Sequence, residues 1–133
     1  MPSGKLCIGA VFKISDEAAG HAKFHIIVAE KSGELATVYI NTEARYKQLP
    51  ETVQASQFPL YPQQCEFLKH ESFADCGSIK EFNKSKINEL IQKTPGYHCG
   101  QISQEIMTRI IDVLNRSKIL ERITKEKYSF RLK

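Results

Sequence analysis

The sequence has no long hydrophobic run. Charged residues interrupt the longest apolar stretches within a few positions, and none approaches the roughly 20 apolar residues that a membrane-spanning helix needs. The N-terminus also lacks the basic start and the apolar stretch that are typical of a secretory signal. We therefore expect a soluble, cytoplasmic protein that does not bind a membrane.

Motifs that bind nucleotides or metals are also absent. No glycine-rich phosphate loop is present, which excludes the kinase and dinucleotide-binding classes. The four cysteines and four histidines include neither a CxxC nor an HExxH spacing. The residues that could form a site are Cys65, His70, Cys76, His98 and Cys99. Because the adjacent His98 and Cys99 cannot easily reach one tetrahedral ion, we expect no metal and no cofactor.

The length of 133 residues fits one domain with a core large enough to fold unaided. Such a chain needs no disulfides, so we expect reduced and mostly buried thiols. Up to residue 78 the chain has seven basic and nine acidic residues, and after residue 78 it has twelve and six. This C-terminal excess of positive charge suits a polyanion or an acidic protein partner, although a solvated helix face with a basic tail would give the same pattern.

The first part of the chain, about residues 5–78, is predicted to be β-rich. Three short segments rich in Val, Ile, Phe and Tyr predict strands: Leu6–Ile14, Lys23–Glu30 and Glu34–Asn41. The connection Lys31-Ser32-Gly33 predicts a tight hairpin between the second and third strands. A long irregular crossing is expected over residues 42–64, followed by a strand with a bend in "CEFLKHESFADC".

The second part, about residues 79–133, is predicted to be helical. In "EFNKSKINELIQK" the apolar residues Phe82, Ile87, Leu90 and Ile91 lie near one helical face. In "SQEIMTRIIDVLNRSKILERI" an N-cap serine precedes an apolar stripe that would pack on the sheet. The cap is Ser103, and the stripe consists of Ile106, Ile110, Val113 and Leu114.

Three clusters of residues could carry chemistry. His21, Lys23 and His25 alternate at the start of the second strand, so they would project from one face, where imidazoles move protons and an ammonium binds phosphate. Thr42 and Arg45 follow the third strand, and a guanidinium there could hold a phosphate. His70 and Ser72 would share one face of an extended segment, with Lys69 and Glu71 on the other. Each cluster alone is also typical of ordinary surface.

These segments together resemble a known family. Their order is similar to that in the MazF/PemK/Kid-like toxins. It consists of a first strand "GKLCIGAVF", then "KFHIIVAE", a third strand ending in "VYINT", a polar crossing, and "FLKHESFADC" followed by helices. The nearest resemblance is to PemK-like proteins with a lysine-histidine-x-Ser-aromatic segment. That segment is here Lys69, His70, Ser72 and Phe73, and the resemblance covers roughly Gly9 to Phe82.

The resemblance implies an α+β fold, a small and strongly bent SH3-like β-barrel with C-terminal helices. It also implies a metal-independent endoribonuclease that cleaves single-stranded RNA, forms a homodimer and is neutralised by an acidic antitoxin. The catalytic set would be His21, Lys23, His25, Thr42, Arg45 and His70, and the substrate-binding set Tyr46, Lys69 and Ser72. The Arg-Pro pair that the family has before the second strand is missing, and Lys23 or His21 occupies that region.

Two other interpretations remain open. One is a non-catalytic SH3-like module that binds RNA or an acidic protein through its basic C-terminal helix. The other is a structural subunit whose histidines are surface or satisfied core groups.

Overall fold

The computed structural model describes residues 6–16 and 21–130. Its described strands form one antiparallel sheet in the order β4-β5-β3-β2-β1-β7, with β6 paired to β3 outside this path. The strands are β1 Ala10–Asp16, β2 His21–Lys31, β3 Glu34–Thr42, β4 Gln57–Leu60, β5 Ser72–Asp75, β6 Lys80–Asn83 and β7 His98–Gln101. Among the described pairings, β4 and β7 at the two ends of the path do not meet, so the α+β fold has an open sheet rather than the expected closed barrel.

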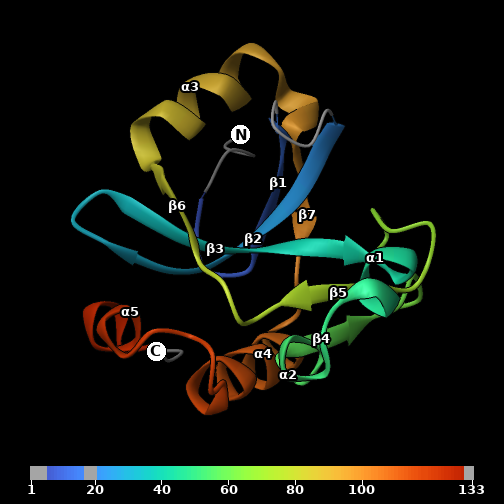
Figure 1. Ribbon diagram of the computed structural model, residues 1–133. Helices are drawn as coiled ribbons and strands as arrows, with labels where there is room; N and C mark the ends of the chain where they lie inside the picture. The colour runs from blue at the N-terminus through green and yellow to red at the C-terminus, as the bar shows by residue number, and fades with distance from the viewer. Residues whose placement is uncertain (1–5, 17–20, 131–133) are drawn as a thin grey trace.

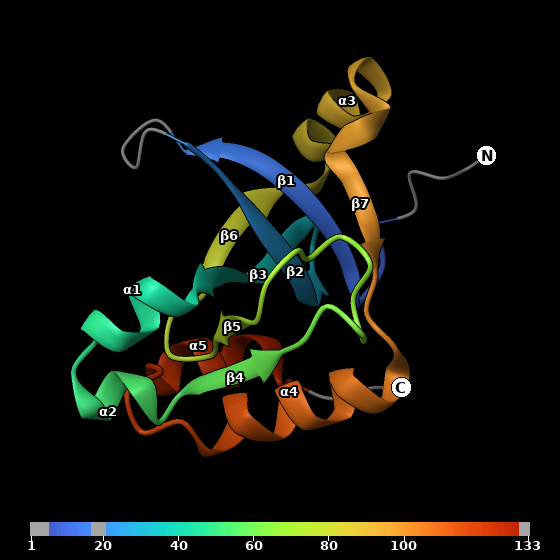
Figure 2. The same cartoon turned by 90° about the vertical axis from the view of Figure 1, so that its right-hand side faces the viewer.

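Helices cover the two faces of this sheet (Figure 1). α3 (Lys84–Lys93) lies on one face, and α4 (Gln104–Arg116) and α5 (Arg122–Tyr128) lie on the other. Two short helices, α1 (Glu43–Gln48) and α2 (Glu51–Gln54), lie beside the ends of β3 and β4, as the rotated view in Figure 2 shows. None of the helices in the described ranges is long and apolar enough to cross a membrane.

The predicted hairpin between the second and third strands is confirmed. Lys31 pairs with Glu34, and the two residues between them have positive φ angles of 52° at Ser32 and 82° at Gly33. Positive φ at both central residues is the type I′ geometry, whose twist matches that of the flanking strands. The connection is therefore a two-residue turn, one residue shorter than the sequence suggested.

β3 changes its partner along its length. Its pairing with β2 runs from Glu34 to Tyr39, which is opposite His25. The last residues, Ile40 to Thr42, pair instead with β5. The start of β2 continues alone against β1, where Lys23 pairs with Ile14. Beyond the His25–Tyr39 pair, β2 and β3 therefore separate.

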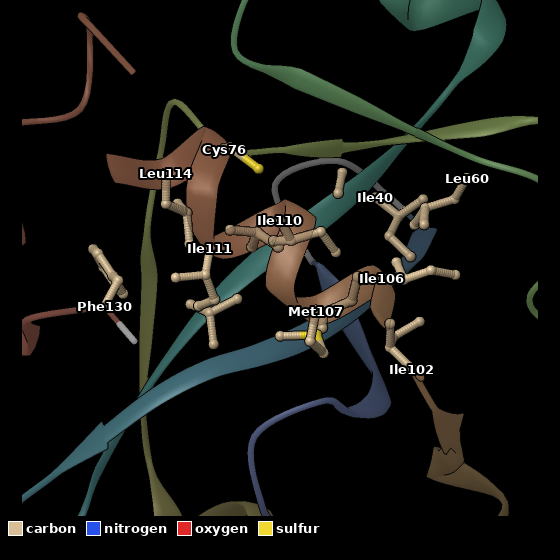
Figure 3. Close-up of a cluster of buried hydrophobic side chains, with 14 of the residues drawn as sticks. Ile40, Leu60, Cys76, Ile102, Ile106, Met107, Ile110, Ile111, Leu114 and Phe130 are labelled. Atoms are coloured by element: carbon tan, nitrogen blue, oxygen red, sulfur yellow. The ribbon is translucent and has the colours of Figure 1, made fainter. Parts of the chain in front are cut away.

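The larger core lies between the sheet and α4. Ser103 caps this helix by accepting a hydrogen bond from the Ile106 backbone at 3.3 Å, as its sequence predicts. The apolar stripe packs against sheet residues such as Ile40 and Leu60 (Figure 3). Its buried members are Ile106, Met107, Ile110, Ile111 and Leu114, whereas Val113 is half-buried.

A smaller core lies between the sheet and α3. Ile87 and Ile91 pack there with Phe12 and Leu35, as expected of the apolar face of this helix. The expectation was wrong for Leu90, which is 41% exposed, and for Phe82, which belongs to strand β6.

Several short elements differ from the sequence expectations. The expected irregular crossing contains α1, α2 and β4, and only Ser72–Asp75 of the expected strand "CEFLKHESFADC" is extended. The segment expected to be helical supplies the strands β6 and β7. Each of these strands has four residues, too few to show the alternation of apolar and polar residues that is typical of a strand. They form because β3 and β1 offer them a free edge.

The C-terminal helical pattern is interrupted at Ser117. The hydroxyl of Ser117 lies 2.7 Å from that of Ser56 and accepts a hydrogen bond from the Leu120 backbone. The ammonium of Lys125 donates to the Ser117 carbonyl at 2.6 Å. These contacts end α4 and fold α5 back against the molecule.

Three of the described basic residues near the C-terminus, Arg116, Arg122 and Lys127, contact carboxylates. Arg116 contacts Asp112 at 2.7 Å and Arg122 contacts Glu126 at 3.7 Å, each pair one turn apart on a helix. Lys127 contacts two carboxylates, Glu34 at 3.2 Å and Glu81 at 2.8 Å. Tyr128 also donates a hydrogen bond to Glu81. Lys127 and Tyr128 therefore hold α5 on the sheet.

The contacts of Glu81 predict that the attachment of α5 weakens in acid. Hydrogen bonds from Lys127 and Tyr128 lower the pKa of Glu81 below its ordinary value of 4.5. Because the folded pKa lies below the unfolded one, this contribution is complete above pH 4.5 and is lost as the pH falls through the folded pKa. We expect Glu81→Gln to lower the urea midpoint at neutral pH and to make the midpoint less dependent on pH below 4.5.

Glu89→Gln is the matched control, because Glu89 is an exposed carboxylate on α3 outside the ion pairs of the described residues. The urea midpoint is measured from pH 3 to 7 by circular dichroism. Equal pH profiles for wild type and Glu81→Gln would contradict the prediction.

Candidate functional site

A cleft opens where β2 and β3 separate. Its volume is about 990 Å³. Four pieces of chain line it: Lys13 on β1, residues 22–24 at the start of β2, residues 40–45 from the end of β3 into α1, and residues 67–72 before β5. The cleft therefore gathers residues from distant parts of the sequence.

Positive charge predominates in the cleft. It is lined by four basic residues, Lys13, Lys23, Arg45 and Lys69, against two acidic ones, Glu43 and Glu71. Within the described residues, none of the ion pairs includes any of these four cations. Cations that gather without carboxylate partners produce a positive potential that attracts anions.

Two aromatic rings also line the cleft. The ring centroids of Phe24 and Phe67 lie 5.0 Å apart, and the ammonium of Lys13 is 5.7 Å from the Phe24 centroid. Both rings are half-buried. Phe67 packs against Gly100 of β7, where an added Cβ would lie 3.3 Å from the ring. The rings are thus held in place and remain partly accessible.

The polar end of β3 is ordered by the cap of α1. Thr42 is the N-cap residue, and its hydroxyl oxygen accepts a hydrogen bond from the Arg45 backbone at 3.1 Å. This capping role, together with Glu43 in the first turn, explains why a helix begins here. It leaves the side chain of Arg45 exposed beside the cleft.

The loop before β5 presents Lys69 and His70. It is anchored by the buried residues Cys65 and Leu68, and the Leu68 backbone donates to the Cys65 carbonyl at 3.0 Å. Ser72 is buried and donates to the His70 carbonyl at 3.1 Å, whereas His70 is exposed. The expectation that His70 and Ser72 share one face of an extended strand was therefore wrong, because the chain turns between Leu68 and Ser72.

His25 is a core residue that lies away from the cleft. Its side chain is 6% exposed, and its ring centroid lies 5.5 Å from that of Phe12 and 5.0 Å from that of Phe82. The Thr37 hydroxyl donates to the Lys80 carbonyl, so it accepts from Nδ1 of His25 at 3.3 Å. The sequence pattern suggested that His25 and His70 could share one site, and the structure does not bring them together.

Six of the nine candidate residues line the cleft: Lys23, Thr42, Arg45, Lys69, His70 and Ser72. Tyr46 packs instead on Phe73, with ring centroids 3.9 Å apart. The side chain of His21 lies outside the described part of the structure.

Sequence reasoning missed Lys13, Phe24 and Phe67. Lys13 and Phe24 are opposite each other in the pairing of β1 with β2. The register of this pairing follows only from the length of the connection between the two strands, which the sequence did not reveal.

The cysteines do not form a reactive centre. All four are free, and burial raises the pKa of the thiols of Cys65 and Cys76. Cys99 is half-buried and Cys7 is exposed, so the expectation of buried thiols is confirmed for two of the four. In the ranges that the structure describes, no group of three His, Cys, Asp or Glu residues could hold a metal ion.

No protein-family model matches the chain, and a comparison with curated proteins finds no significant match. The resemblance to the MazF/PemK toxins therefore depends on the short motifs quoted above.

The position of His25 predicts a structural role. We expect His25→Ala to lower the free energy of unfolding by about 2–4 kcal/mol, because it removes a ring packed between Phe12 and Phe82. His70→Ala changes an exposed ring and should alter stability by less than about 0.5 kcal/mol. Urea denaturation measures both changes. A fully stable His25→Ala variant would be inconsistent with the packed core seen here.

Proposed function

We propose that this protein binds single-stranded RNA in the cleft between β2 and β3. The observation that carries the proposal is the group of four cations, Lys13, Lys23, Arg45 and Lys69, that line the cleft outside the ion pairs of the described residues. Four cations near the C-terminus, in contrast, contact carboxylates or carbonyl groups: Arg116, Arg122, Lys125 and Lys127. This difference favours the cleft over the C-terminal helix as the site of anion binding.

The aromatic rings favour RNA over an acidic protein. The carboxylates of an acidic protein would bind to the cations alone and would make no use of the rings. The half-buried rings of Phe24 and Phe67, in contrast, match the flat faces of unpaired bases. Bases within a duplex are stacked on one another and cannot lie on a side chain in this way. A single strand would place phosphates near the cations and bases on the rings.

The geometry supports binding better than cleavage. Metal-independent cleavage needs one group that takes the proton of the 2′-hydroxyl and another that protonates the leaving oxygen. His70 lines the cleft, but His25 packs in the core and the Thr42 hydroxyl oxygen caps α1. The toxin activity, the barrel-like bending, the acidic antitoxin and the homodimer remain predictions of the family resemblance.

The charge contribution can be tested by the salt dependence of binding. We expect Arg45→Ala and Lys69→Ala to weaken binding of a fluorescent mixed-sequence RNA and each to reduce the slope of log K against log salt by about 0.7, the value for one phosphate contact on a single strand. Fluorescence anisotropy at several KCl concentrations measures both quantities. Arg116→Ala is the matched control, since Arg116 pairs with Asp112 outside the cleft.

Equal losses in Arg116→Ala and Arg45→Ala would place the binding elsewhere. The RNA recovered from the same samples, incubated in EDTA, should be intact. Fragments with cyclic phosphate ends that disappear in His70→Ala would instead support the endoribonuclease function.

The aromatic contribution predicts a loss that does not depend on salt. Phe67→Leu keeps apolar volume against Gly100 but removes the ring, so we expect it to weaken RNA binding by about 1–3 kcal/mol with an unchanged salt slope. Tyr61→Leu is the control, because Tyr61 is 41% exposed and lies outside the cleft. Full affinity in Phe67→Leu would exclude base stacking on Phe67.

A further inference from the structure

A third aromatic ring lies next to the cleft on the opposite face of the sheet. Tyr39 on β3 is opposite His25 in the last residue pair before β2 and β3 separate. Its ring centroid is 6.4 Å from that of His25, which belongs to the face covered by α3. The rings of Phe24 and Phe67 pack instead with the core on the α4 face. The two aromatic groups are thus on opposite faces at the point where the sheet opens.

Two lysines flank the Tyr39 ring. The ammonium of Lys23 is 4.3 Å from the ring centroid, and that of Lys80, on β6, is 5.8 Å from it. Neither lysine takes part in the ion pairs among the described residues. Both ammonium groups carry positive charge beside the same ring, so they attract an anion to this position.

Lys23 connects this position to the cleft. It lines the cleft at the start of β2, and from this strand edge its ammonium reaches the Tyr39 ring. A phosphate beside Lys23 could therefore follow a nucleotide in the cleft and precede one stacked on Tyr39.

We propose that Tyr39, Lys23 and Lys80 form a second subsite for the same RNA strand. The strand leaves the cleft beside Lys23, places a phosphate between the two lysines and stacks a base on the Tyr39 ring. This inference depends on the proposed function of the cleft. It adds that the bound strand continues from one face of the sheet to the other, so binding requires more nucleotides than the cleft alone can hold.

The subsite can be tested with single-stranded RNA of two lengths, about 4 and about 12 nucleotides, within the range of site sizes known for single-strand binding domains. The wild type should bind the longer RNA more tightly. Tyr39→Leu should weaken binding of the longer RNA about fivefold or more, the loss expected for one stacked base, and leave binding of the shorter RNA unchanged. Tyr39→Phe keeps the ring and should bind both lengths like the wild type.

Lys80→Ala should reduce the salt slope by about 0.7 for the longer RNA alone. Lys86→Ala, which removes an exposed lysine of α3, is the matched control. Unchanged binding of the shorter RNA also shows that each variant is folded. If Tyr39→Leu binds the longer RNA with wild-type affinity, the second subsite is excluded and the cleft remains the binding site. If the wild type binds neither RNA, both the subsite and the proposed function are excluded.

Discussion

The divergence of β3 from β2 is the constraint on which the rest of the structure depends. One edge of β3 pairs with β2 only as far as Tyr39, while its other edge pairs first with β6 and then with β5. The last residues of β3 pair with β5 and diverge from β2, so the start of β2 keeps only β1 as its partner. The gap between the two strands becomes the cleft.

The distribution of charge follows from this architecture. Lys127 holds α5 against the sheet by contacting Glu34 on β3 and Glu81 on β6. The cations of the cleft come from strand ends and loops that converge, and their nearest acidic residues are too few to neutralise them. Net charge along the sequence pointed to the C-terminal segment, whereas the fold brings Lys13, Lys23, Arg45 and Lys69 together at the cleft, outside the ion pairs of the described residues.

Local patterns predicted those parts of the fold that local forces determine. The hairpin at Ser32-Gly33 and the cap and stripe of α4 depend on neighbours in sequence, and both are confirmed. β6 and β7 form because distant strands offer free edges, which no local period reveals. Six candidate residues do line one cleft, but the place of His25 depends on Phe12 and Phe82, contacts that only the tertiary structure creates.

The alternation of side chains along β2 determines what chemistry this strand can contribute. Phe24 faces the cleft, and its neighbour His25 must then face the α3 core, because successive residues of a strand point to opposite faces. Lys23 lies two residues before His25, so it points to the same face of the sheet as His25. It therefore lines the cleft from the strand edge and extends over Tyr39. A shift of one residue would place imidazole and ammonium groups in the cleft and Phe24 in the α3 core. With the register seen here, β2 contributes an aromatic surface and a phosphate contact, which suits binding of a strand better than proton transfer to it.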